Sequence, residues 1–180
     1  MVHDHAKNFY NYGNAHQECL AHIIRYLKDS IINEPNLKWN LMMRDLLREM
    51  IHYRNSLKPD EDLDAKIVSK YEARYNKILE IAKEEYEYEP PTKYYVEGYN
   101  LSKRLDEYKE SHLLFLHNKL VPTTNNLAER LLRVFKRKQK QVMTFRSFES
   151  LTYICNCMGI IASLHADEQN LYENISSFFS

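Results

Sequence analysis

The stretch LAHIIRYLKDSI, residues 20–31, decides the fold class. Its apolar residues recur at spacings of three and four positions: Leu20, Ile23, Ile24, Leu27 and Ile31. That spacing is typical of an α-helix that buries one face. Asn14 stands three residues before Gln17, in a spacing that caps helices, and Pro35 interrupts the pattern. The sequence therefore predicts a helix that begins after Asn14 and ends before Pro35.

Helical patterns dominate the rest of the chain as well. The predicted segments are the residues after Asn36, 60–88, 94–117 with a weak point near Gly98, the residues from Asn126 onward, the residues after Ser147, and a short tail ending at Phe178 and Phe179. Residues 121–124 are predicted to be extended. The first two residues, Met1 and Val2, resemble the last part of a strand, so we expect the chain to begin within a fold. The fold class is mainly α.

Composition excludes several classes of protein. The chain has 180 residues with 3 Gly and 5 Pro, which disfavours a many-stranded β sandwich or barrel. Apolar residues make up 44% and charged residues 28%, which excludes a disordered tail. No apolar run approaches the roughly 18 residues that span a bilayer, and no signal peptide is recognisable. Cys19, Cys155 and Cys157 lack the spacing of a disulfide framework, which suits a reducing cytosol, so we expect an intracellular protein with no membrane partner.

Charge is unevenly placed, although acidic and basic residues balance at 25 each. Between positions 130 and 146 the basic residues occur without any acid: Arg130, Arg133, Lys136, Arg137, Lys138, Lys140 and Arg146. On a helix that begins near Asn126, most of these bases fall on one side and the apolar residues on the other. This arrangement predicts a surface that binds the phosphates of a nucleic acid.

Glu129 is the only carboxylate among those bases, and it has two interpretations. A carboxylate within a phosphate-binding face can hold a divalent cation against a phosphodiester. Alternatively, Asn126 and Glu129 have the spacing of a capping box, and Glu129 can pair with Arg133 one turn later. The residues alone leave both interpretations open.

Two further groups near the N-terminus are candidates for chemistry. His16, Cys19 and His22 are metal-capable residues at regular spacing, but on one helix they rotate about 120° between the first and the last. A tetrahedral zinc site from this trio is therefore disfavoured, and Cys19 is expected to pack as a small buried side chain. Asp4 lies between two histidines at the end of the predicted strand, where carboxylates often ligate metals.

Taken together, these residues resemble the insertion-sequence-66-type bacterial transposases. The most specific stretch is VPTTNNLAER, residues 121–130, continuing to Arg133 and the bases after it. Asp4 matches the second acid of that family, and Cys19-x-x-His22 ahead of Arg25 matches the segment that follows it. Residues 145–150, FRSFES, resemble the closing segment.

The resemblance implies a ribonuclease-H-like catalytic core in which three acids hold two divalent metals. Asp4 would be the second acid and Glu129 the third, with Mg²⁺ or Mn²⁺ as the metals. The resemblance assigns no residue to the first acid, so we expect a partial core without its early strands and no strand cleavage by this chain alone. Residues 1–180 would form a single domain, in which 1–13 carry a strand and the second acid, 14–120 a large helical insertion, and 121–180 the catalytic and closing helices.

The function implied is DNA transposition: cleavage at transposon ends and strand transfer into target DNA, in the bacterial cytoplasm at the nucleoid. Whether this chain is itself an enzyme is left open. The residues expected to bind DNA are Arg130, Arg133, Lys136, Arg137, Lys138 and Lys140. The alternative function is a non-catalytic DNA-binding remnant or regulator that uses the helix 126–140. An exposed apolar seam would favour a homodimer.

Overall fold

A computed structural model describes residues 1–58, 60–93, 95–141, 147–166 and 170–177. The chain divides into two compact units, Met1–Asn125 and Asn126–Ser180. The domain organisation expected from the sequence, a single domain over residues 1–180, stays a prediction.

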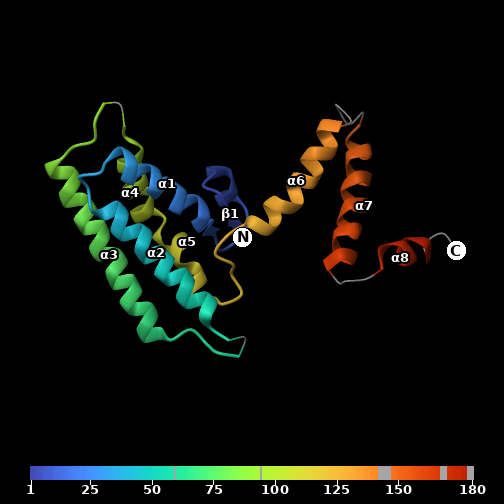
Figure 1. Cartoon of the computed structure of the whole chain (residues 1–180), viewed down its shortest axis with the longest axis horizontal. Helices are drawn as coiled ribbons and strands as arrows, with labels where there is room; N and C mark the ends of the chain where they lie inside the picture. Colours follow the sequence, from blue (N-terminus) through green and yellow to red (C-terminus); the bar gives the residue numbers. More distant parts are fainter. Residues whose placement is uncertain (59, 94, 142–146, 167–169, 178–180) are drawn as a thin grey trace. The chain divides into compact units, whose positions relative to one another are not determined.

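The first unit is built from helices and one pair of very short strands (Figure 1). In chain order its elements are β1 (Val2–His3), the 3₁₀ helix η1 (Lys7–Asn11), β2 (Gln17–Glu18), α1 (Leu20–Asn33), α2 (Trp39–Ser56), α3 (Ala65–Tyr88), α4 (Glu97–Glu107), α5 (Lys109–Leu113) and the 3₁₀ helix η2 (Leu114–Leu116). The mainly α class is confirmed.

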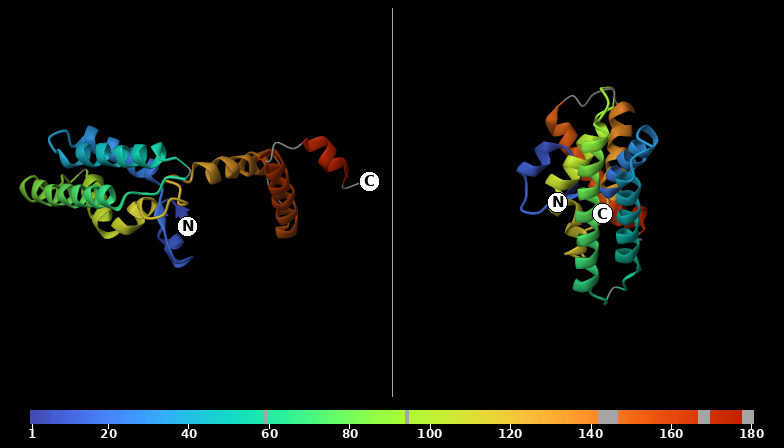
Figure 2. Two further views of the ribbon diagram at one scale, coloured as in Figure 1. Left: turned by 90° about the horizontal axis from the view of Figure 1, so that it is seen from below. Right: turned by 90° about the vertical axis from the view of Figure 1, so that its left-hand side faces the viewer.

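The core of this unit lies between its helices. Helices α1 and α3 both pack against α2, and α4 packs against α1 and α3 (Figures 1 and 2). The predicted stripe of α1 is confirmed, since Leu20, Ile23 and Leu27 are fully buried. The largest side chains in this core with no exposed surface are Trp39, Tyr75 and Phe115 of η2. Burial of these aliphatic and aromatic faces stabilises the unit.

The predicted start of the first helix is wrong. Gln17 and Glu18 do not continue α1 but form β2, which pairs in parallel with β1 in the register Val2 with Gln17 and His3 with Glu18. The amide of Cys19 then donates to the His3 carbonyl at 2.8 Å, and α1 begins at Leu20. The Gln17 side chain accepts from the Phe115 amide at 2.9 Å. Contacts with residues far along the chain override the local helical pattern here.

Two other predicted boundaries also shift. Helix α3 begins at Ala65 rather than at residue 60, because the Asp64 side chain accepts from the Lys66 amide at 2.7 Å and caps it. The segment 94–117 breaks at Tyr108 and not near Gly98. Gly98 instead lies buried in the first turn of α4, where an added Cβ would collide with the Glu34 carboxylate.

The second unit contains α6 (Asn126–Gln141), α7 (Phe148–Ala166) and α8 (Leu171–Ser177). The predicted cap at Ser147 is confirmed, since its hydroxyl accepts from the Ser150 amide at 3.1 Å. Helix α7 packs against both α6 and α8. Arg146, Phe178 and Phe179 lie outside the described residues.

The strand content is small. Among the described residues the strands are β1 and β2, together with an isolated bridge between Thr92 and Tyr95. Strands of a ribonuclease-H-like sheet would be longer, so that core stays a proposal. Within the same described part of the chain, no helix combines the length and apolar character that crossing a membrane requires.

Candidate functional site

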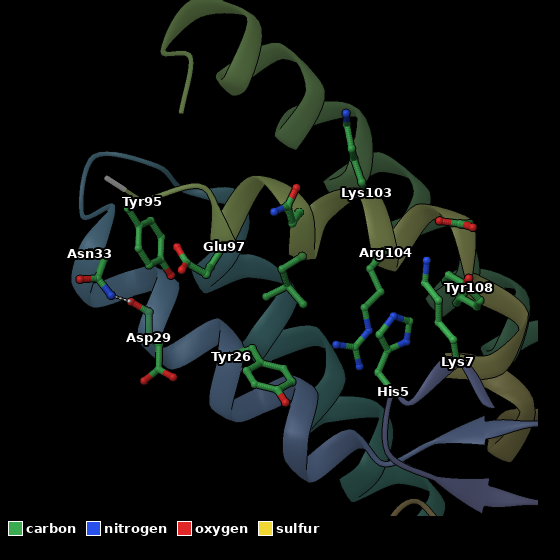
Figure 3. Close-up of a pocket in the computed structure, with 13 residues that line it drawn as sticks. His5, Lys7, Tyr26, Asp29, Asn33, Tyr95, Glu97, Lys103, Arg104 and Tyr108 are labelled. Carbon is green, nitrogen blue, oxygen red and sulfur yellow. Dashed lines mark hydrogen bonds between the residues drawn. The ribbon is translucent and has the colours of Figure 1, made fainter. Parts of the chain in front are cut away.

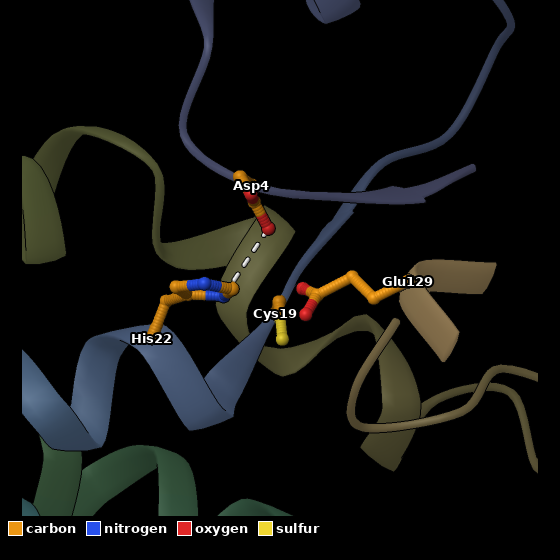
Figure 4. Close-up of side chains that lie close together, drawn as sticks. All are labelled: Asp4, Cys19, His22 and Glu129. Carbon is orange, nitrogen blue, oxygen red and sulfur yellow. Dashed lines mark ion pairs between the residues drawn. The ribbon is translucent and has the colours of Figure 1, made fainter. Parts of the chain in front are cut away.

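The predicted acid Asp4 lies beside Cys19 and His22 in the first unit (Figure 4). One ligand atom from each of these three side chains lies within 4.8 Å of the others. Asp4 Oδ1 is 3.1 Å from His22 Nδ1, and the Asp4 side chain is 49% exposed. Cys19 is buried and His22 is 18% exposed, so the group forms a shallow site with one open side.

Each of the three side chains is placed by the strand pair. Asp4 follows β1 directly, Cys19 is the single residue between β2 and α1, and His22 lies in the first turn of α1. The Leu20 amide donates to the Thr123 carbonyl at 3.0 Å, which holds the segment after η2 against the start of α1. From that segment Asn125 Nδ2 donates to Asp4 Oδ1 at 3.1 Å. The carboxylate is thus oriented by an imidazole and an amide.

The structure groups the metal-capable residues differently from the sequence pattern. His16 is not part of the group, since its Nδ1 lies 3.0 Å from His3 Nε2. Asp4 is the third member in its place. Local spacing could not indicate this grouping, because Cys19 lies before α1 and not within a helix, and the strand pair brings the residue after β1 to the residue before α1.

Glu129 belongs to the second unit, where it lies in the first turn of α6. Its Oε2 is 3.7 Å from Arg133 Nη2, so the ion pair expected one turn apart is present. The Arg133 side chain is 74% exposed and the Glu129 side chain 28%. Helical pairs one turn apart contribute only about 0.3–0.5 kcal/mol, which leaves room for a second role. Figure 4 also draws Glu129. Its role in catalysis stays a prediction.

The basic face of α6 is defined here by Arg130, Arg133, Lys136, Arg137 and Lys140, all of which are exposed. The side chain of Lys138, the sixth predicted base, lies outside the described side chains. Two apolar residues of the same helix are exposed too, Leu127 by 70% and Leu132 by 56%. The helix therefore presents both a cationic and an apolar surface.

A buried charge cluster that the sequence did not reveal surrounds Glu18. This carboxylate has no exposed surface, and both of its oxygens have partners. Glu18 Oε1 accepts from the Tyr10 hydroxyl at 2.5 Å and lies 2.6 Å from His5 Nδ1. Glu18 Oε2 accepts from Arg104 Nε at 3.0 Å and lies 3.3 Å from His112 Nε2. These partners come from the loop after β1 and from η1, α4 and α5, so no local sequence pattern could have indicated them.

Burial and pairing lower the pKa values of Glu18 and His112, two of the groups in this cluster. Burial alone would raise the pKa of Glu18, but hydrogen bonds from His112, Tyr10 and Arg104 outweigh it and hold that pKa far below its ordinary range. Burial also lowers the pKa of His112, although Glu18 opposes this. Both groups therefore bind protons less readily in the folded chain than in the unfolded one.

Acidification is accordingly expected to destabilise the first unit in two stages. Where the folded pKa is the lower one, the unfolded chain binds more protons, and the free energy of unfolding falls as the pH falls. The loss should begin below about pH 6.5 as the unfolded chain protonates His112, and continue below about pH 4.5 through Glu18. Urea unfolding, followed by Trp39 fluorescence at a series of pH values from 8 to 3, measures the free energy of unfolding at each pH. In His112→Gln the loss of stability that begins below about pH 6.5 should be smaller. A wild-type free energy of unfolding that rises as the pH falls from 8 to 5.5 would contradict the assignment of this loss to His112.

A pocket of about 810 Å³ lies beside this cluster (Figure 3). Its lining includes His5 and Arg104 of the cluster, together with Tyr26 and Tyr108. Bases and acids both face it, among them Lys7, Lys103, Asp29, Glu97 and Glu107. Because the charges are mixed, the pocket favours no single class of ligand.

Comparison with known proteins gives one match. A family model described as "Transposase IS66 family" matches residues 1–152 of the 180-residue chain. No curated protein and no solved structure matches the chain. The matched range includes Asp4, Cys19, His22, Glu129 and the whole basic face of α6.

Proposed function

The chain belongs to the IS66 transposase family, and from this premise we propose that it acts on DNA in transposition. In this proposal Asp4 and Glu129 are two of the three acids of a metal-dependent site, and the basic face of α6, with Lys138, binds the DNA backbone. The ribonuclease-H-like core is part of the same proposal. It is supported by Asp4 following a strand that is paired in parallel.

The observation that carries the proposal is the composition of α6. Five described bases of this helix are exposed, and a carboxylate lies in its first turn, within the range that matches the family. Bases on one helix can neutralise successive phosphates, and a carboxylate beside them can reach a cation that is bound to the same backbone. A helix that served only to pack would have no need of this many exposed bases.

Asp4 and Glu129 would provide part of the oxygen ligands that Mg²⁺ or Mn²⁺ requires. Both ions prefer oxygen ligands, and Asp4 offers a half-exposed carboxylate whose Oδ1 is already oriented by Asn125. When bound, such a cation supplies Lewis-acid activation of the phosphodiester and of the attacking water. The chain's own residues would hold the cation, position the phosphate against α6 and orient Asp4. Two acids are fewer than the three that the complete site uses.

The alternative is DNA binding without catalysis, and one observation favours it. Glu129 is paired with Arg133 at 3.7 Å, as it would be if its role were only to support the helix. In either case the proposed place of action is the bacterial cytoplasm at the nucleoid. The exposed Leu127 and Leu132 support a homodimer that is formed through α6.

A nicking assay tests the catalytic part of the proposal. Supercoiled DNA incubated with the purified chain and Mg²⁺ or Mn²⁺ should remain uncut, because only two of the three acids are assigned. Glu129→Gln is the matched control for contaminating nucleases. Nicking by the wild type that this substitution abolishes would show that the chain is active alone, and would contradict the expected inactivity.

A further inference from the structure

We propose that Asp4, Cys19 and His22 form a binding site for Zn²⁺ or a similar transition-metal ion within the first unit. The inference goes beyond the proposed function, because it adds Cys19 and His22 as ligands for a different class of metal; Asp4 is the one residue that it shares with the proposed transposition site. It rests on the three side chains alone and does not require Glu129.

The chemistry of the three ligands selects the metal. A thiolate and an imidazole are the ligands that Zn²⁺ and Co²⁺ prefer, whereas Mg²⁺ takes oxygen ligands and binds sulfur poorly. A carboxylate, an imidazole and a thiolate leave a fourth tetrahedral position for water, as in open zinc sites. Because the Asp4 side chain is half exposed, an ion can reach these ligands from the solvent.

The geometry requires only a small adjustment. In a tetrahedral zinc site, neighbouring ligand atoms are separated by about 3.3–3.6 Å, given the metal–ligand distances of oxygen, nitrogen and sulfur. Asp4 Oδ1 and His22 Nδ1 are already 3.1 Å apart. All three ligand atoms lie within 4.8 Å of one another. To reach the separations of a tetrahedral site, the Cys19 thiol would have to move toward the other two ligands by about 1 Å.

The surrounding structure holds the ligands in place before any ion binds. The Cys19 amide is bonded to His3 at 2.8 Å, and Asn125 holds Asp4 Oδ1 at 3.1 Å. His22 lies on a helix whose first turn is anchored to Thr123. Residues that support metal ligands in this way commonly change affinity by about 10–100-fold when they are removed.

Cobalt titration of the full chain tests the site. Co²⁺ bound to a thiolate gives an intense ultraviolet charge-transfer band, and tetrahedral Co²⁺ gives strong visible bands. Cys155 and Cys157 are exposed and could bind cobalt themselves, so the titration uses a Cys155→Ser/Cys157→Ser background. In that background we expect one equivalent of Co²⁺ to give both bands, which Zn²⁺ abolishes and excess Mg²⁺ does not.

Single variants separate the site from an incidental thiol. Cys19→Ser should remove the charge-transfer band, and His22→Gln or Asp4→Asn should weaken cobalt binding by at least about tenfold. His16→Gln is the matched control, since His16 pairs with His3, and it should leave the bands unchanged. Circular dichroism confirms that each variant is folded.

Two results would overturn the proposal: a background protein that shows no thiolate band, or bands that survive Cys19→Ser. Mn²⁺ and DNA binding, measured on the same Cys19→Ser protein, should be unchanged. Failure of the cobalt site therefore leaves the transposition proposal standing. Loss of Mn²⁺ binding in Glu129→Gln leaves the cobalt site standing, because Asp4 is the only residue that the two proposed sites share.

Discussion

Replacing Glu18 with alanine is expected to lower the free energy of unfolding of the first unit by about 3 kcal/mol, at the lower end of the range for breaking a buried ion pair. Removal of the carboxylate leaves the Arg104 guanidinium and two imidazoles without their shared acceptor. Arg104 is 15% exposed, so water recovers part of the loss. Trp39 is the chain's single tryptophan and is buried in this unit, so its fluorescence during urea unfolding reports the change directly.

Glu49→Ala is the matched control on the same unit. Glu49 forms a two-bonded ion pair with Arg74, at 2.8 and 2.7 Å, but both side chains are about half exposed. Surface pairs of this kind contribute about 0.2–1 kcal/mol. Equal losses from the two substitutions would mean that burial of Glu18 has no energetic consequence, which contradicts the account of the cluster. Glu18→Gln provides a milder variant if the alanine protein does not fold.

The second large effect is expected in DNA binding. If the six predicted bases of α6 each neutralise one phosphate, the affinity for duplex DNA should fall about 10³-fold between 50 and 200 mM salt, with a logarithmic slope of about −5.4. Arg133→Gln combined with Arg137→Gln should reduce that slope to about −3.6 and weaken binding at low salt. Fluorescence anisotropy with a labelled duplex measures both quantities.

Lys70→Gln combined with Lys77→Gln is the control for loss of charge alone. Both lysines are exposed on α3, in the first unit, and removing them changes the net charge by the same amount. The control should keep the steep slope. If both double variants lower the slope equally, the binding is a general property of the charged surface and α6 has no special role.

Much of the helical architecture could be predicted from local pattern. The stripe of Leu20, Ile23 and Leu27 and the cap at Ser147 depend on residues one turn apart, so the sequence indicates them directly. The start of α1 could not be predicted in this way. Gln17 and Glu18 form β2 because residues near the N-terminus and near position 115 satisfy their backbone and side chains.

In the candidate site, too, some features follow from the sequence and others depend on contacts between residues far apart in it. The family resemblance pointed to Asp4 and Glu129, and a zinc site formed by His16, Cys19 and His22 was disfavoured from their spacing on one helix. Only the register of β1 with β2 brings Asp4 to Cys19 and removes His16. The Glu18 cluster was missed for a related reason, since its partner Arg104 is 86 positions away in the sequence.

The most direct test of the proposed transposition site is a double-mutant cycle on Mn²⁺ affinity. Asp4→Asn, Glu129→Gln and the double variant are each titrated with Mn²⁺ in the presence of duplex DNA, and free ion is measured by electron paramagnetic resonance. If both acids hold one cation, each single substitution weakens binding and the double variant is little worse than either, with a coupling of about 0.5–3 kcal/mol. Losses that simply add, or an affinity that neither substitution changes, would contradict the assignment of Asp4 and Glu129 to one site.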